Sequence, residues 1–126
     1  MSTKTHWMNE SRPVLEWYGL KCLGKRLNSG SVTRLELVDN NLANALPTEL
    51  AHLSSVEHFE LAHNAHLTSS IPTELDLLSN VQYFDLASNS LTSTIPSEFA
   101  LLSNVEDFFL DQNFISGDGL LPGFRW

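Results

Sequence analysis

The sequence Val32-Thr-Arg-Leu-Glu-Leu-Val-Asp-Asn40 decides the fold, because its pattern returns three more times along the chain. The later copies are Val56-Glu-His-Phe-Glu-Leu-Ala-His-Asn64, Val81-Gln-Tyr-Phe-Asp-Leu-Ala-Ser-Asn89 and Val105-Glu-Asp-Phe-Phe-Leu-Asp-Gln-Asn113. Successive copies begin 24, 25 and 24 residues apart. A period of this length is typical of a solenoid, in which each repeat forms one coil and buries its apolar face against the next coil.

Within each copy, apolar and polar residues alternate, as in Leu35-Glu-Leu37. This alternation predicts a short strand with one buried face and one wet face. The Asn that closes each copy is predicted to point inward and to satisfy backbone groups of the neighbouring turns, which gives a ladder of stacked amides. Phe59, Phe84 and Phe108 are predicted to form one internal aromatic column.

A second motif follows the strand in three of the copies. It consists of Pro, then Thr or Ser, then Glu, then an apolar residue, and it occurs at Pro47-Thr-Glu-Leu50, Pro72-Thr-Glu-Leu75 and Pro96-Ser-Glu-Phe99. Pro at the start and an acidic first turn predict a single short helical turn. Each coil is therefore expected to contain a strand, a turn, a second extended piece and a short helix.

The combined pattern LxxLxLxxNxLxxxIPxxLxxL resembles the plant-type leucine-rich repeat, which is found in plant receptor ectodomains and polygalacturonase inhibitors. Trp7 and the segment Leu15-Glu-Trp-Tyr-Gly-Leu-Lys-Cys22 resemble the N-terminal cap of that family. The resemblance implies an α/β fold: a right-handed leucine-rich repeat solenoid of about four repeats. Its parallel β-sheet would line the concave face, with short helical or 3-10 turns on the convex side.

The resemblance also implies three segments. Residues 1–31 would form the N-terminal cap (a helical segment plus a strand or hairpin), residues 32–115 the repeats, which start at 32, 56, 81 and 105, and residues 116–126 a degenerate C-terminal tail or cap. The chain departs from the family pattern in its second extended pieces, where the usual Gly is replaced by Asn44, Ser69 and Ser93. Leu15 replaces the first cap Cys, so the family's cap disulfide cannot form within this chain. One extra residue at Ala65-His66 is predicted to bulge the turn of the second repeat.

Charge is distributed unevenly. Between Leu35 and Phe124 there is no Lys or Arg, and this stretch contains 13 of the 15 acidic residues. Such an acidic body argues against nucleic acid and anionic membranes as partners. No apolar run has the length of a membrane span, so direct membrane insertion by this segment is not expected.

The compartment stays open between two alternatives. The N-terminus lacks the apolar stretch of a signal peptide, and the chain has a single Cys. These two features favour a cytoplasmic protein, whereas the family resemblance implies an extracellular or cell-surface protein. A chain that is a fragment of a longer receptor would reconcile the two.

Equivalent residues of stacked parallel strands form columns, because neighbouring strands lie about 4.8 Å apart. Two adjacent columns on the concave face are predicted to bind the ligand. One contains Glu36, Glu60, Asp85 and Phe109. The other begins with Arg34, and its predicted ligand-binding residues are His58, Tyr83 and Asp107. Tyr83 and Phe109 are the expected anchors, since rigid aromatic side chains bury much area for little lost entropy.

The carboxylate column has three possible fates: the side chains splay into water, meet a basic partner, or bind a divalent metal. Side chains from adjacent strands point in parallel and converge poorly, so we expect no metal site and no cofactor. His58, His63 and His66 are expected to be ordinary surface histidines. No nucleophile elbow, phosphate loop or zinc motif is present, so no catalytic residue is assigned and an enzyme is not expected.

These features predict a module that binds a protein or peptide ligand through its concave face, as part of a receptor-like or secreted recognition protein. The alternative hypothesis is a structural module that associates end-on through its apolar C-terminal residues Phe114, Phe124 and Trp126. A third, minor hypothesis follows from Thr68-Ser-Ser70 and Thr92-Ser-Thr94, whose stacked hydroxyl groups resemble those of some ice-binding proteins.

Overall fold

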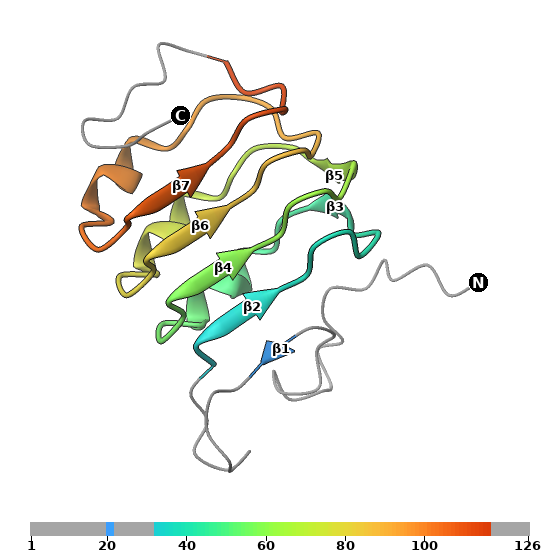
Figure 1. The fold of residues 1–126 in the computed structure, drawn as a ribbon. Helices are drawn as coiled ribbons and strands as arrows, with labels where there is room; N and C mark the ends of the chain where they lie inside the picture. Colours follow the sequence, from blue (N-terminus) through green and yellow to red (C-terminus); the bar gives the residue numbers. More distant parts are fainter. Residues whose placement is uncertain (1–19, 22–31, 117–126) are drawn as a thin grey trace.

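The structure, a computed structural model, describes residues 20–21 and 32–116. These residues form stacked coils whose strands lie side by side in one five-stranded sheet (Figure 1). In spatial order the strands are β1 (Leu20–Lys21), β2 (Arg34–Glu36), β4 (His58–Glu60), β6 (Tyr83–Asp85) and β7 (Asp107–Phe109). The strands β2, β4, β6 and β7 pair in parallel, and β1 pairs with β2 in the antiparallel sense.

The register of the sheet aligns equivalent residues of successive coils. Arg34 pairs with His58, which pairs with Tyr83, which pairs with Asp107. The neighbouring column contains Glu36, Glu60, Asp85 and Phe109. This register confirms the predicted columns. It is the register that keeps the apolar residues buried, since a one-residue slip would turn every buried residue of a strand toward solvent.

A second, smaller sheet is formed by the extended segments that follow β2 and β4 in the chain. It contains β3 (Ala43–Ala45) and β5 (His66–Thr68), which are parallel. An isolated bridge continues the pairing from Ser70 to Thr92. Thr68-Ser-Ser70 thus meets Thr92-Ser-Thr94 with a stagger of two residues, whereas the sequence comparison predicted residue-on-residue stacking. The backbone sets this stagger, since the Thr92 N–H donates to the Ser69 carbonyl at 2.9 Å.

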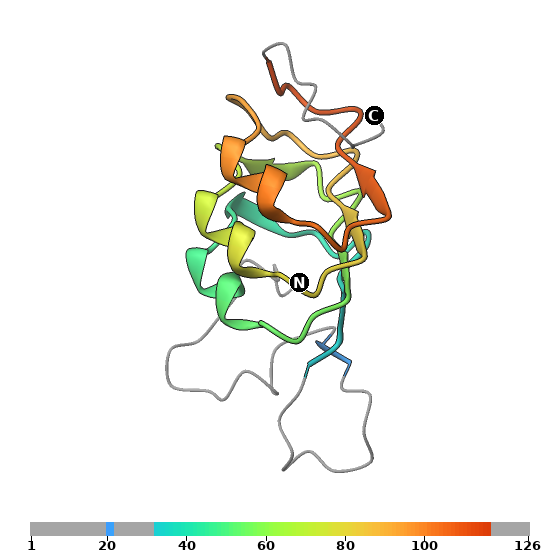
Figure 2. The same cartoon turned by 90° about the vertical axis from the view of Figure 1, so that its left-hand side faces the viewer.

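In the described residues, three 3-10 helices lie on the side of the molecule opposite the main sheet (Figure 2). They are η2 (Thr48–His52), η3 (Thr73–Leu77) and η4 (Ser97–Leu101). Each follows a Pro whose carbonyl accepts the first hydrogen bond of the turn, as in Phe99 N–H to Pro96 O at 3.1 Å. The predicted solenoid with a parallel sheet on one side and short helical turns on the other is confirmed.

The core lies between the sheet and the helices, and an aromatic stack runs along it. Phe59 and Phe84 are stacked with ring centroids 5.0 Å apart, and Phe84 and Phe108 with centroids 5.1 Å apart. Phe99, from η4, packs edge-on against both Phe84 and Phe108. The centroid spacing follows the spacing of the strands, so the aromatic column predicted from the sequence is confirmed.

The predicted asparagine ladder is also confirmed for Asn64, Asn89 and Asn113. The amide oxygen of Asn64 accepts hydrogen bonds from the N–H groups of Asn40 (2.9 Å) and Leu42 (3.0 Å). Its amide nitrogen donates to the carbonyls of Leu37 and Leu61, both at 2.9 Å. Asn89 and Asn113 repeat this arrangement in the next coils. One side chain therefore satisfies buried backbone groups of its own coil and of the preceding coil.

The positions where the family pattern has Gly adopt left-handed backbone conformations. Asn44, Ser69 and Ser93 have φ angles of 69°, 69° and 67°. A residue with a Cβ atom in this region costs about 1–2 kcal/mol, and Gly avoids that cost. The structure thus explains why Gly is usual at this position. Asn tolerates the left-handed conformation moderately and Ser poorly, so these residues make the chain less stable than Gly at the same positions would.

Several sequence-based predictions fall on residues outside the described ranges. One is the cap predicted for residues 1–31, of which only β1 is described. Another is the tail after Ser116, which contains Phe124 and Trp126. The extra residue of the second coil lies within the described part, in a turn that the Leu67 N–H closes on the Asn64 carbonyl at 2.9 Å. In the ranges that the structure describes, no helix has the length and apolar character needed to cross a membrane.

Replacing Asn64 by Ala is expected to lower the free energy of unfolding by about 3 kcal/mol, because two N–H donors and several carbonyls would lose their buried partner. Urea denaturation followed by circular dichroism measures this change. Asn104→Ala is the matched control, since the exposed Asn104 amide makes one hydrogen bond, to Ser79 O. That control should stay within about 0.5 kcal/mol of wild type. Equal losses in both variants would contradict a stabilising role for the buried ladder.

Candidate functional site

The candidate site is the open face of the main sheet, formed by residues of β2, β4, β6 and β7 and called the concave face below. Side chains alternate along a strand, so residues two apart share a face. Each strand therefore presents a pair on this face: Arg34 and Glu36, His58 and Glu60, Tyr83 and Asp85, and Asp107 and Phe109. All seven residues predicted from the sequence as ligand-binding belong to these pairs.

In β2, β4 and β6, the two members of each pair contact each other. Arg34 forms an ion pair with Glu36, and the Nε–H of Arg34 donates to Glu36 Oε1 at 3.0 Å. The Tyr83 hydroxyl donates to Asp85 Oδ2 at 3.2 Å. His58 Nε2 lies 3.0 Å from Glu60 Oε2, an arrangement in which the ring N–H donates to the carboxylate. Each carboxylate of the column thus has a donor on its own strand, and splaying into water is not how their repulsion is relieved.

An aromatic strip crosses the strands on the same face. The rings of His58 and Tyr83 are stacked, with centroids 4.4 Å apart and planes 2° apart. Phe109 lies beyond Tyr83 at 5.6 Å, tilted by 52°, and is 37% exposed. The strip therefore leads from a polar end at His58 to an apolar, solvent-exposed end at Phe109.

Asp85 differs from the sequence-based expectation of a wet, ligand-facing carboxylate. Its side chain is buried, and its Oδ1 accepts a hydrogen bond from the Ala87 N–H at 2.8 Å. Its Oδ2 accepts from the Tyr83 hydroxyl, so both carboxylate oxygens have a hydrogen-bond donor. Through these two hydrogen bonds, Asp85 orients the Tyr83 side chain and the backbone that follows β6.

The environment of Tyr83 favours its neutral form. Burial raises the pKa of Tyr83 to about 12, and the negative charges of Asp85, Glu60 and Asp107 act in the same direction, as does the hydrogen bond to Asp85. A neutral hydroxyl can keep donating to Asp85 throughout the physiological range. Tyr83 is therefore held in place as a rigid, uncharged part of the concave face.

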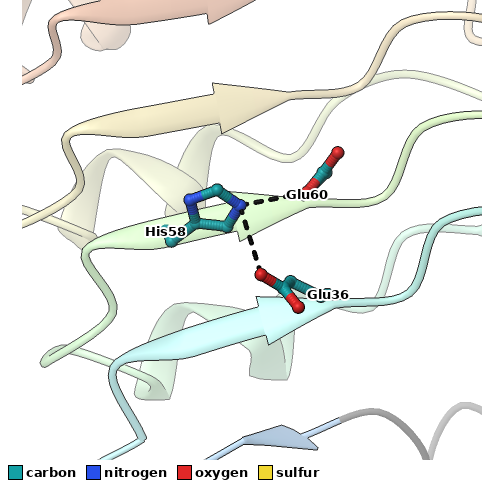
Figure 3. A group of neighbouring side chains, drawn as sticks. All are labelled: Glu36, His58 and Glu60. Carbon is teal, nitrogen blue, oxygen red and sulfur yellow. Dashed lines mark hydrogen bonds and ion pairs between the residues drawn. The ribbon is translucent and has the colours of Figure 1, made fainter. Parts of the chain in front are cut away.

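Glu36, His58 and Glu60 form a compact cluster across β2 and β4 (Figure 3). Besides its contact with Glu60, His58 Nε2 lies 3.7 Å from Glu36 Oε1. One donor atom from each of the three residues lies within 4.8 Å of the other two. Side chains of adjacent strands were expected to converge poorly. They converge here because His58 occupies the neighbouring column and leans diagonally toward both carboxylates. His63 and His66 are exposed.

The last strand of the face has a different character. Asp107 in β7 takes the position that Arg34, His58 and Tyr83 occupy in the other strands, and it is exposed. Phe109 takes the position of the carboxylates. The face thus changes from carboxylates with a partner on their own strand at β2 and β4 to an exposed carboxylate beside an exposed aromatic ring at β7.

Arg34 lies in the column expected from its sequence position, although no role was predicted for it. Its contact with Glu36 could have been predicted, because residues i and i+2 of a strand share a face and their charges are opposite. The diagonal approach of His58 to Glu36 could not, since it depends on the side-chain conformations that the stack on Tyr83 permits.

Comparison with known proteins agrees with this geometry. Residues 80–102 match the Leucine Rich Repeat family. The chain is a leucine-rich repeat protein of the plant type. No curated protein sequence matches this leucine-rich repeat protein.

Among solved structures, the leucine-rich repeat protein is similar to plant receptor ectodomains. The crystal structure of PEPR1–AtPEP1 shares 33% sequence identity with a TM-score of 0.67, over 71% of this chain and 12% of that one. The plant peptide hormone receptor RGFR1 in complex with RGF2 shares 26% identity with a TM-score of 0.67, over 81% of this chain and 18% of that one. The leucine-rich repeat protein thus spans less than a fifth of the length of either receptor.

A shorter ectodomain matches over most of both chains. The BIR2 ectodomain from Arabidopsis thaliana shares 20% identity with a TM-score of 0.60, over 93% of this leucine-rich repeat protein and 86% of that chain. Identity at this level shows a common fold alone.

Tyr83 is expected to ionise about two pH units later than an ordinary tyrosine, whose pKa is about 10. The unfolded chain releases this proton first, so the contribution of Tyr83 to stability is complete below pH 10 and is lost as the pH rises toward 12. Absorbance titration at 295 nm measures the ionisation. The Tyr83→Phe variant should lack the late transition. A wild-type titration without any transition later than that of an ordinary tyrosine, or a late transition that persists in Tyr83→Phe, would contradict the assignment.

Proposed function

We propose that this leucine-rich repeat protein is a recognition module that binds a protein or peptide through the concave face, with its centre at Tyr83, Asp107 and Phe109. The aromatic strip supports this proposal most strongly. Phe109 is exposed and Tyr83 is held rigidly by its stack on His58 and its hydrogen bond to Asp85. Pre-oriented aromatic rings bury ligand surface with little loss of side-chain entropy.

The charges of the face favour a ligand with a cationic group near an apolar one. Glu36 forms an ion pair with Arg34, and Glu60 is hydrogen-bonded to His58 Nε2, so both carboxylates already have a partner on their own strand. Asp107 is exposed and lies beside the exposed ring of Phe109. A Lys or Arg side chain placed there can pair with the carboxylate and lie against aromatic faces.

The relatives support the same class of function. One is described as a plant peptide hormone receptor in complex with RGF2. A second is the PEPR1–AtPEP1 structure. Parallel side chains on a sheet provide a binding surface readily and a convergent catalytic site rarely, so we propose a binding role rather than an enzymatic one.

Panning a displayed library of random dodecapeptides on the full chain tests the proposal. We expect enriched peptides that combine Lys or Arg with an apolar residue. Phe109→Ala should weaken their binding roughly tenfold or more, because an anchor side chain of this kind contributes at least 1–2 kcal/mol. Asp107→Lys should weaken it further by repelling the basic residue, as measured by surface plasmon resonance.

Leu101→Ala is the matched control, since Leu101 is also exposed and apolar but lies in η4, on the opposite side. Binding by this variant should equal that of wild type. Peptides that bind Phe109→Ala and Asp107→Lys as tightly as wild type, or that lose binding on Leu101→Ala, would exclude the concave face.

End-on association is the second candidate, and the exposure of Phe114 favours it. This ring follows the last strand of the described sheet and is 71% exposed. If the molecule assembles through this end, sedimentation velocity should show a dimer whose fraction increases with protein concentration. This dimer should be absent in Phe114→Ser. A monomer at all concentrations would exclude the assembly role and leave peptide recognition unaffected.

A further inference from the structure

The cluster of Glu36, His58 and Glu60 has the composition of a metal site. It provides one imidazole nitrogen and two carboxylates, and the three donor atoms lie within 4.8 Å of one another. Imidazole selects borderline first-row cations such as Zn²⁺, whereas Ca²⁺ and Mg²⁺ prefer all-oxygen surroundings. The donor set therefore points to a transition-metal cation rather than to a hard one.

The spacing of the donors fits such a cation. Ligand bonds of about 2.0–2.2 Å in a tetrahedral arrangement place donor atoms about 3.4 Å apart. His58 Nε2 lies 3.0 Å from the Glu60 oxygen and 3.7 Å from the Glu36 oxygen, so small side-chain movements suffice. The hydrogen bond between His58 and Glu60 already directs Nε2 toward the carboxylates (Figure 3). A bound cation would take the place of the Nε2 proton, leaving a neutral ring with its proton on Nδ1.

Two features organise the cluster in advance. The stack on Tyr83 fixes the plane of the His58 ring. The parallel pairing of β2 with β4 fixes the separation of the backbone positions of Glu36 and Glu60. The three side chains are only 19–24% exposed, which limits competition from water. A preorganised donor set loses little entropy when it binds an ion.

Arg34 provides the counter-charge when no cation is bound. Its ion pair with Glu36 involves Oε1, the same oxygen that lies closest to His58. A cation bound at the cluster would compete with Arg34 for this oxygen. The Arg34 side chain is 38% exposed, so its guanidinium can move into water.

We propose that Glu36, His58 and Glu60 form a three-ligand site for a first-row divalent cation, represented by Zn²⁺, whose fourth position faces the concave surface. Three protein ligands with one open position are typical of sites at which a metal binds a further ligand. The site does not depend on the peptide-binding proposal, because it is measured on the chain alone.

Isothermal titration of the full chain with ZnCl₂ tests the site. We expect one Zn²⁺ per chain with an affinity reduced at least tenfold in His58→Gln and in Glu60→Gln, which keep the side-chain size. Arg34→Met should bind Zn²⁺ several-fold more tightly, because the competing guanidinium is gone. A purely structural role for the cluster would not produce this opposite change. MgCl₂ and CaCl₂ should bind at least a hundredfold more weakly.

The matched controls remove other histidines and the thiol. A His63→Gln, His66→Gln double variant keeps a tolerated backbone, since Gln112 occupies the position equivalent to His63 with a similar φ angle. This variant and Cys22→Ser should bind Zn²⁺ as wild type does. Unchanged binding in His58→Gln, loss of binding in either control, or no Zn²⁺ binding by wild type and Arg34→Met would each overturn the proposal. Circular dichroism melting confirms that every variant is folded.

Discussion

Every coil of this protein depends on its neighbour to satisfy buried backbone groups. In the middle of the stack, the Asn64 amide bridges two coils by accepting from the N–H groups of Asn40 and Leu42 and donating to Leu37 O and Leu61 O. A stack without this amide would leave these groups buried without partners, at a cost of about 1–3 kcal/mol each. The amide ladder and the aromatic column therefore make stacking obligatory, and stacking is what creates a continuous sheet.

The functional surface is a consequence of that sheet. Once equivalent residues are aligned at strand spacing, any sequence difference between coils becomes a gradient across the concave face. Here the gradient leads from the Arg34–Glu36 pair, through the His58–Tyr83 stack, to the exposed Asp107 and Phe109. A peptide lying across the strands meets paired charges at one end and an aromatic, acidic surface at the other. The metal site proposed at Glu36, His58 and Glu60 would add an ordered cation to the end where the charges are paired.

Much of this arrangement could be predicted before the structure was known. The repeat period gave the parallel sheet and its columns, because hydrophobic alternation permits only one register. The closing asparagines and the Phe59, Phe84 and Phe108 column followed from the same alignment, and the Pro-Thr-Glu motif located the 3-10 turns. The site was predicted less completely. Asp85 was expected in water but is buried and accepts hydrogen bonds from the Tyr83 hydroxyl and the Ala87 N–H. The stagger at Ser70 and Thr92 came from backbone hydrogen bonds, which side-chain identity does not report.

The sequence by itself determined the solenoid, the order of its coils and which residues share each column, since period and alternation are properties of the chain alone. Only the tertiary structure decided which neighbours within and between columns touch. Arg34 and Glu36 could have been paired from their spacing, but the approach of His58 to both Glu36 and Glu60 depends on the ring conformation that stacking on Tyr83 imposes. Side-chain conformations are chosen by three-dimensional packing, so the chemistry of the face emerged only when the coils were stacked.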